Sequence, residues 1–358
     1  RLTVSRQLSL SVGTLGSLED GEDDLVPGQQ VERYQVEERI GSGGMGTVYR
    51  VRHVQLGSQH ALKVLHRTSR AVRERLIREG RAQSRLAHPN VVAVTDIVDV
   101  EGSPGLVLEL VRGPTLSQLL ARQEGRLAAA TVHGIACDVL RGVAAAHEAG
   151  IVHRDLKPAN VLLLPTRDGF VAKVSDFGLA RVLAGDEADE VGLTGSRAPM
   201  GTPAYMAPEQ VHDASRADER SDVFALGALL YELISGETAF GAPDVISIYD
   251  KVRAGDFVPL DEIAPETDPH WVDVVHRALA VDPADRFADG PELLAAWRAG
   301  EGSLQDPGTE EVARSLARAT QPRPPMRGDS SPSTPIPAGS SPERPRLLTL
   351  GVVAVAAV

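Results

Sequence analysis

The most specific stretch of this sequence is IVHRDLKPAN, residues 151–160, which lies between a helix-like segment and two short β-rich runs. Transfer of a phosphoryl group to a hydroxyl requires a carboxylate that orients the hydroxyl and accepts its proton. It also requires a cation for the developing charge and oxygen ligands for Mg²⁺. Asp155, Lys157 and Asn160 can supply a proton acceptor, a cation and an oxygen ligand in turn. The stretch therefore predicts a catalytic loop.

A second candidate for the metal site is Asp176, which is followed by Phe177 and Gly178. An aspartate before a glycine in a loop is most often part of a simple turn. Downstream of residues 151–160, however, its carboxylate is a further hard ligand suited to Mg²⁺. We therefore expect Asn160 and Asp176 to hold the metal ion.

A glycine-rich segment, GSGGMG at residues 41–46, lies between two strand-like runs at 34–40 and 47–53. Glycines let the backbone approach phosphates closely and permit φ angles that other residues avoid. The same pattern marks dinucleotide-binding folds, but there the glycines open a helix. Here they run into a β-rich segment, which favours a flap over ATP. A plain glycine hairpin is the alternative.

A lysine and a glutamate in the β-rich first part of the chain are both predicted to point inward. Lys63 lies in the apolar middle of a strand at 59–65, where an unpaired ammonium would be costly. In the helix-like segment at 70–87, Glu79 shares one face with apolar side chains such as Leu76. An inward lysine and an inward glutamate can neutralise each other while Lys63 also reaches a phosphate. The alternative is that both lie at the surface.

The order of the segments predicts two unequal lobes. Before Gly113 the chain is mostly β-rich, with one helix-like segment; after it the chain is mostly helical. A nearly all-apolar segment at 223–234 is too short to span a bilayer and is typical of a buried helix. Further helices are expected at 131–147 and 291–300.

Together, in this order, these motifs resemble those of the eukaryotic-like Ser/Thr protein kinases, in particular the bacterial membrane-anchored branch. The resemblance covers about residues 34–300 and implies an α+β bilobal kinase fold, with an N-lobe at 34–111 and a C-lobe at 112–300. It implies ATP with Mg²⁺, or Mn²⁺ as an alternative ion, as cofactors and proteins as substrates. The residues it assigns to catalysis, phosphates and metal are Gly41, Gly43, Gly46, Lys63 paired with Glu79, Asp155, Lys157, Asn160 and Asp176.

The same resemblance implies an adenine pocket between the lobes. Leu108 takes the gatekeeper position, and Glu109 and Val111 would offer hinge backbone groups to the adenine edge. The apolar residues that would enclose the base are Ile40, Val48, Ala61 and Leu162.

Structural and regulatory roles are implied as well. Glu209, in the Ala207-Pro208-Glu209 segment, would pair with Arg286, and Asp222 would fix the catalytic-loop backbone. Arg154 beside Asp155 needs a counter-charge, which a phosphorylated loop can supply. We therefore expect autophosphorylation between two copies of the chain, at the sites Thr194 (first choice), Ser196 or Thr202.

Two positions depart from the family pattern. Gln83 stands where an apolar residue facing Phe177 is preferred, and Gly80 weakens its helix by about 1 kcal/mol relative to alanine. Both predict a helix that swings outward readily.

Composition and the chain ends limit the other functions. The chain has 358 residues and a net charge of −12, which argues against a nucleic-acid partner. Residues 1–33 are expected to be a mobile tail, and the Pro/Ser-rich residues 301–346 a disordered linker. Residues 347–358 are apolar and follow arginines. We expect them to begin a single transmembrane helix that anchors a cytoplasmic kinase domain to the bacterial inner membrane; a short helix packed on the domain is the alternative.

Three other functions can be weighed from the residues. A pseudokinase, a binding or scaffold module on the same fold, is expected to lack Lys63, Asp155 or Asp176, and all three are present. A small-molecule kinase lacks the 207–209 segment. A tyrosine kinase is disfavoured by Lys157 and by the Gly201-Thr202 sequence.

Overall fold

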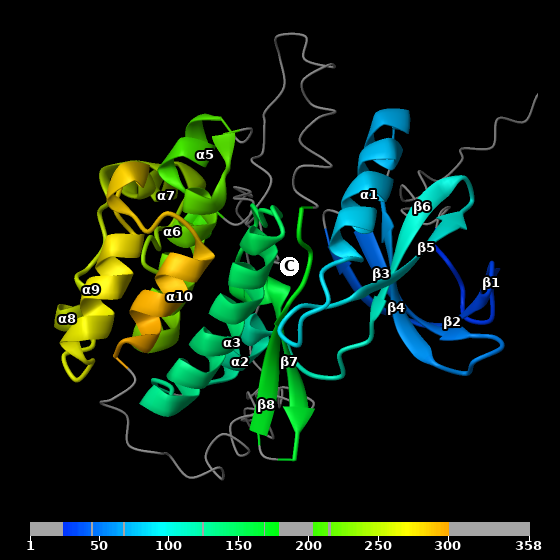
Figure 1. The fold of residues 1–358 in the computed structure, drawn as a ribbon, viewed down its shortest axis with the longest axis horizontal. Helices are drawn as coiled ribbons and strands as arrows, with labels where there is room; N and C mark the ends of the chain where they lie inside the picture. Colours follow the sequence, from blue (N-terminus) through cyan, green and yellow to red (C-terminus); the bar gives the residue numbers. More distant parts are fainter. Residues whose placement is uncertain are drawn as a thin grey trace, which may run out of the picture.

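The computed structural model describes residues 24–43, 46–66, 69–123, 125–167, 169–178, 203–213 and 216–300. Figure 1 shows a β-rich lobe on one side and a helical lobe on the other, with α3 and the β7–β8 hairpin between them. The predicted α+β bilobal architecture is confirmed.

In the described N-lobe, six antiparallel strands form one sheet in the order β1-β2-β3-β4-β6-β5. Successive side chains alternate between its two faces, so that Leu62 and Val107 enter one apolar cluster and Ala61 and Leu108 the other. The strands are β1 (Gln30–Val31), β2 (Tyr34–Gly43), β3 (Gly46–His53), β4 (Gln59–Leu65), β5 (Val94–Val100) and β6 (Ser103–Glu109).

The one helix in the described part of the N-lobe, α1 (Arg70–Gln83), packs against β5 and β6. The Ser69 hydroxyl caps it by accepting a hydrogen bond from the backbone N–H of Val72. A Cβ added to Gly80 would come within 2.9 Å of Leu106 and 3.2 Å of Ile97. Gly80 therefore lets the helix lie close to the sheet. The close packing is a second role for this glycine, beside the predicted weakening of the helix.

Two long helices, α3 (Ala129–Glu148) and α6 (Glu219–Ser235), form the centre of the C-lobe. As expected, α6 is buried nearly all round; it begins at the cap Asp218 and ends at Gly236, whose φ of 80° suits a glycine. The other elements are α2 (Leu116–Arg122), η1 (Pro158–Asn160), β7 (Val161–Thr166), β8 (Gly169–Val174), η2 (Pro203–Tyr205), α5 (Pro208–His212), α7 (Val245–Ala254), α8 (Leu260–Ile263), α9 (Pro269–Ala278), η4 (Pro283–Asp285) and α10 (Gly290–Arg298).

The N-terminal boundary of the domain differs from the expectation. Residues 24–33, assigned to a mobile tail, carry β1, and Leu25 and Val31 are buried in the apolar cluster of the sheet. Apolar burial gives this segment a fixed place in the lobe. Residues 301–358 lie outside the described part of the chain. None of the helices in the described part is long and apolar enough to cross a bilayer.

Candidate active site

The backbone of the 151–160 loop is held by Asp222 in the first turn of α6. Its carboxylate accepts hydrogen bonds from the backbone N–H of His153 at 2.6 Å and of Arg154 at 2.7 Å. The His147 ring lies 2.9 Å from the same carboxylate. Arg154 has a φ of 71°, which is unfavourable for a residue with a side chain. A buried carboxylate with several donors thus stabilises a loop conformation that the chain would otherwise avoid.

Three candidate side chains of the loop lie close together. The Lys157 ammonium lies 2.8 Å from Asp155 Oδ2. The Asn160 amide nitrogen donates to the Asp155 carbonyl oxygen at 2.8 Å and contacts its carboxylate at 3.3 Å. Because the amide nitrogen faces Asp155, the amide oxygen of Asn160 points away and stays suited to a cation.

Lys63 bonds to a different carboxylate from the one expected. Its ammonium lies 2.8 Å from Asp176 Oδ2, and the described residues form no ion pair between Lys63 and Glu79. Glu79 instead faces Gly178, where Glu79 Oε2 would lie 3.3 Å from an added Cβ, and Arg78 lies 3.7 Å from its other oxygen. Asp176 has a φ of 66°, and the nearby carboxylate satisfies the buried ammonium. The predicted Lys63–Glu79 pair is therefore not formed in this structure.

The two metal-ligand candidates fit a magnesium ion. Asn160 and Asp176 offer an amide and a carboxylate oxygen, which are the donor types that Mg²⁺ prefers. In the described ranges, no group of three or more His, Cys, Asp or Glu side chains could hold a metal. A site with few protein ligands suits Mg²⁺, which keeps several waters and binds through substrate phosphates.

The expected adenine-enclosing residues mostly share one apolar cluster. Ala61 and Leu108 are buried in it, and Val48, Val111 and Leu162 pack against it half-buried. Ile40 is not part of this cluster, and 45% of it is exposed. The structure therefore brings all of these residues together except Ile40.

Glu109, the predicted hinge residue, has a partner that the sequence motifs did not indicate. Its carboxylate accepts from the Lys173 ammonium on β8 at 2.9 Å, which ties the hinge to the C-lobe hairpin. Lys173 lies between Ala172 and Val174 in an apolar strand, as Lys63 does, and this pattern was the available signal. The backbone N–H of Glu109 is also engaged, at 2.9 Å from the Ala93 carbonyl oxygen.

The three glycines at the adjoining ends of β2 and β3 have different surroundings. A Cβ on Gly46 would overlap the carbonyl oxygen of Val64 on β4, so this position requires a glycine. A Cβ on Gly41 or Gly43 would meet nothing within 4 Å. The backbone there is open to the approach of a ligand.

His153 and Phe177 connect the catalytic loop to Asp176, a role for His153 that the sequence motifs did not predict. Their rings lie 4.6 Å apart, and His153 Nε2 is 2.8 Å from the carbonyl oxygen of Ser175. Phe177 and His153 are both fully buried. These contacts join the Asp176 segment to the catalytic loop.

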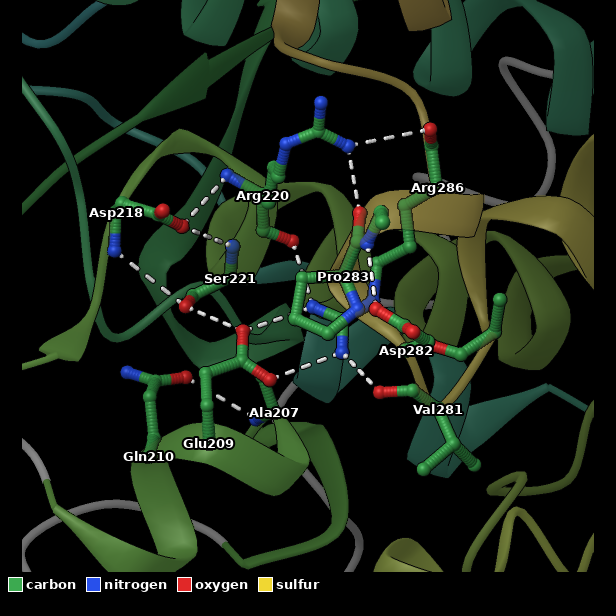
Figure 2. Close-up of polar contacts among 12 residues, drawn as sticks. Ala207, Glu209, Gln210, Asp218, Arg220, Ser221, Val281, Asp282, Pro283 and Arg286 are labelled. Carbon is green, nitrogen blue, oxygen red and sulfur yellow. Dashed lines mark hydrogen bonds and ion pairs between the residues drawn. The ribbon is translucent and has the colours of Figure 1, made fainter.

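Glu209 and Arg286 form a bidentate ion pair inside the C-lobe (Figure 2), at 2.8 and 2.9 Å. The Ser221 hydroxyl donates to the same carboxylate at 2.7 Å. Burial alone would raise the pKa of Glu209, but the hydrogen bonds from Arg286 and Ser221 and the Arg286 charge hold it below its ordinary value. Arg286 also donates to the carbonyl oxygens of Ala280, Arg220 and Val281.

Contacts also join the segment around α5 to the catalytic loop. The Gln210 side chain donates to the Arg154 carbonyl oxygen at 3.2 Å. The Tyr205 hydroxyl donates to Glu232 on α6, and burial raises the pKa of both groups. The regulatory candidates Thr194, Ser196 and Thr202 lie outside the described residues.

Comparisons with known proteins give one consistent result. A family model described as the protein kinase domain matches residues 34–295. The serine/threonine-protein kinase PknL of Mycobacterium tuberculosis is 40% identical over 260 residues, which cover 72% of this chain and 63% of the relative. The serine/threonine-protein kinase pkn3 of Myxococcus xanthus is 37% identical over 290 residues, covering 77% of this chain and 51% of the relative. The chain thus spans less than two thirds of these relatives.

A solved structure has a similar fold. The crystal structure of the Mycobacterium tuberculosis PknI kinase domain aligns with a TM-score of 0.60 at 28% identity. The alignment covers 77% of this chain and 99% of that domain.

Proposed function

Because this chain belongs to the protein kinase family, among its bacterial serine/threonine members, we propose that it transfers the γ-phosphoryl group of ATP to serine and threonine hydroxyls of proteins. One observation supports this function above all: Lys157 and Asn160 both contact the Asp155 carboxylate. The same loop is joined to the Asp176 segment through the His153 and Phe177 rings. A carboxylate, a cation and metal-ligand oxygens are what this transfer requires.

In the proposed mechanism, Asp155 orients the substrate hydroxyl and accepts its proton. Lys157, 2.8 Å from that carboxylate, stabilises the negative charge that develops on the transferred group. Asn160 and Asp176 hold Mg²⁺, with Mn²⁺ as an alternative ion. When bound there, the ion would supply positive charge that offsets the negative charge of the phosphates.

Nucleotide binding is assigned to the apolar residues between the two lobes. Val48, Ala61 and Leu162 enclose the adenine, Leu108 limits its depth, and Glu109 and Val111 present backbone groups to its edge. The backbone at Gly41 and Gly43 covers the phosphates, because no side chain stands in the way there.

Activation requires Lys63 to change partner. In the proposed active form, Lys63 leaves Asp176, contacts the α- and β-phosphates and pairs with Glu79. Phosphorylation at Thr194, Ser196 or Thr202 supplies the counter-charge to Arg154. One copy of the chain phosphorylates this segment in another.

The setting proposed for the domain is the cytoplasm, where ATP is available. Residues 347–358 would begin a helix that anchors it to the bacterial inner membrane. Substrates are then proteins that reach this surface.

A second candidate is a nucleotide-binding scaffold that transfers no phosphate. It is favoured by one observation, the Lys63–Asp176 ion pair, which occupies a phosphate-binding cation and a metal ligand at the same time.

Incubation with labelled ATP, Mg²⁺ and a generic protein acceptor separates the two candidates. The parent chain is expected to yield phosphoserine or phosphothreonine, whereas Asp155→Asn and Lys63→Met yield none. ATP binding without transfer by the parent would favour the scaffold.

A further inference from the structure

A segment at residues 24–31 packs on the face of the N-lobe sheet that is opposite to the adenine pocket. Leu25 and Val31 are buried there in the cluster that contains Val36 and Tyr49. Backbone hydrogen bonds of 2.8 and 2.9 Å join Gly28 and Gln29 to Val36 on β2. The segment lies outside the residues that the family model matches.

Asp24, at the start of this segment, bonds to two neighbouring strands at once. Its Oδ2 accepts from Arg39 Nη1 on β2 at 2.8 Å, and its Oδ1 accepts from the Tyr49 hydroxyl on β3 at 2.8 Å. The backbone N–H of Leu25 donates to the same hydroxyl at 3.2 Å. Tyr49 is 1% exposed, so its hydroxyl depends on these partners.

The register of the sheet gives these bonds their importance. Arg39 and Tyr49 are directly opposite each other in the β2–β3 pair. The register then shifts between Arg39 and Gly41, and Gly41 pairs with Val48. Asp24 therefore bonds to the last regular cross-strand pair before the glycine-rich loop.

The irregularity makes external support necessary. A shift of this kind leaves one residue unpaired, bends the strand and interrupts the ladder of hydrogen bonds. Ile40 lies at the shift and is exposed. Val48 follows in the pair beyond it and packs toward the adenine pocket, because successive residues of β3 face opposite sides.

We propose that Asp24 is a positioning residue for nucleotide binding: by joining Arg39 and Tyr49 from behind the sheet, it fixes the height of the Gly41 and Gly43 backbone over the phosphates. The inference rests on the proposed ATP site. It assigns a role in the reaction to a segment that precedes the matched domain.

Burial, together with the hydrogen bond to Asp24, raises the pKa of Tyr49, so the hydroxyl keeps its proton and stays a donor. The Asp24 contacts therefore persist across the pH range in which a kinase assay is run.

A purely structural role predicts a different result. Asp24 and Arg39 are partly exposed, and such ion pairs contribute little to global stability. If Asp24 positions the glycine-rich segment, its removal weakens ATP binding. If Asp24 only stabilises the fold, its removal lowers the melting temperature and leaves the KM of the folded fraction unchanged.

The test compares Asp24→Ala with Asp24→Glu and with Gln29→Ala as matched control. Gln29 belongs to the same segment, but its side chain contacts Val26 and Glu101, far from the loop. For Asp24→Ala we expect the KM for ATP to rise about fivefold with kcat within about twofold, as for a lost exposed ion pair with one further hydrogen bond. Gln29→Ala should match the parent, and Asp24→Glu should recover most of the affinity.

Two further measurements keep the outcome decisive. Equilibrium titration with Mg·ATP should show the same fivefold loss of affinity in Asp24→Ala even if the parent transfers no phosphate. A failure of the proposed kinase function can therefore be told apart from a failure of the proposal for Asp24. Hydrogen exchange at residues 40–49 without nucleotide should be faster in Asp24→Ala than in Gln29→Ala. Equal ATP affinity and equal exchange in the two variants would overturn the proposal.

Discussion

Replacing Glu209 with glutamine removes one charge of the buried Glu209–Arg286 pair and changes the shape of the side chain very little. The variant Glu209→Gln leaves the Arg286 guanidinium buried without a counter-charge. One of its two bonds to residue 209 loses its acceptor, because the amide nitrogen is a donor. We therefore expect a large loss in the free energy of unfolding.

The size of the loss follows from what remains around Arg286. Breaking a buried ion pair by removing one partner costs about 3–5 kcal/mol. Three backbone carbonyl oxygens still accept from the guanidinium, and the Phe224 ring lies under it at 4.9 Å. These contacts place the expected loss near the lower bound, at about 3 kcal/mol.

Urea unfolding at pH 7 measures this loss, with Glu292→Gln as matched control. Glu292 pairs with Arg277 at 3.0 Å, but both side chains are nearly half exposed. Its loss should be below about 1 kcal/mol, as for other surface pairs. A loss below about 1 kcal/mol for Glu209→Gln as well would refute the claim that the buried pair stabilises the C-lobe.

The pH dependence gives a second check on the same residue. Because the folded protein lowers the pKa of Glu209, the unfolded chain binds the proton more tightly. The contribution of Glu209 is thus fully present above its unfolded pKa of about 4.3 and is lost as pH falls through the lowered folded value. The parent should lose stability in acid more steeply than Glu209→Gln does.

Other predictions concern the loops and the hinge. Gly46→Ala should destabilise the N-lobe by about 2 kcal/mol in thermal unfolding because its Cβ overlaps Val64, whereas Gly41→Ala should stay within about 0.5 kcal/mol. Asp222→Ala frees the backbone of His153 and Arg154, and kcat in steady-state assays should fall about 100-fold with a small change in the KM for ATP; an unchanged kcat would exclude a positioning role. Lys173→Met leaves Glu109 without its cation, and the free energy of unfolding measured in urea should fall by about 1–3 kcal/mol. An unchanged value would mean that the ion pair is no more stable than the contacts of the two side chains with water.

Much of the fold could be predicted because its signals are local. A short stretch of sequence is enough to recognise the apolar spacing of α3, the all-apolar α6 and the residues of the 151–160 loop. The two residues of β1 are too few to show a periodicity. Their place in the sheet depends on the burial of Leu25 and Val31 against distant strands, which no local pattern encodes.

The composition of the candidate site was predictable, but its pairing was not. The motifs place Lys63, Glu79 and Asp176 in one region. Either of the two carboxylates can neutralise the Lys63 ammonium. The choice depends on the backbone at Asp176, where a φ of 66° is allowed but uncommon for an aspartate. The link between Lys173 and Glu109 was missed for a similar reason, because it joins residues on two lobes.

The position of α1 limits what has to move when Lys63 changes partner. Gly80 holds the helix close to Leu106 and Ile97, and Glu79 already faces Gly178. With α1 already packed on the sheet, we expect Lys63 and Glu79 to meet mainly by rotation of their side chains, with little movement of the helix. A divalent ion held by Asp176 would repel the Lys63 ammonium and remove its partner. Loading of the metal site and formation of the Lys63–Glu79 pair are then expected to occur together, since the same carboxylate cannot serve both cations equally well.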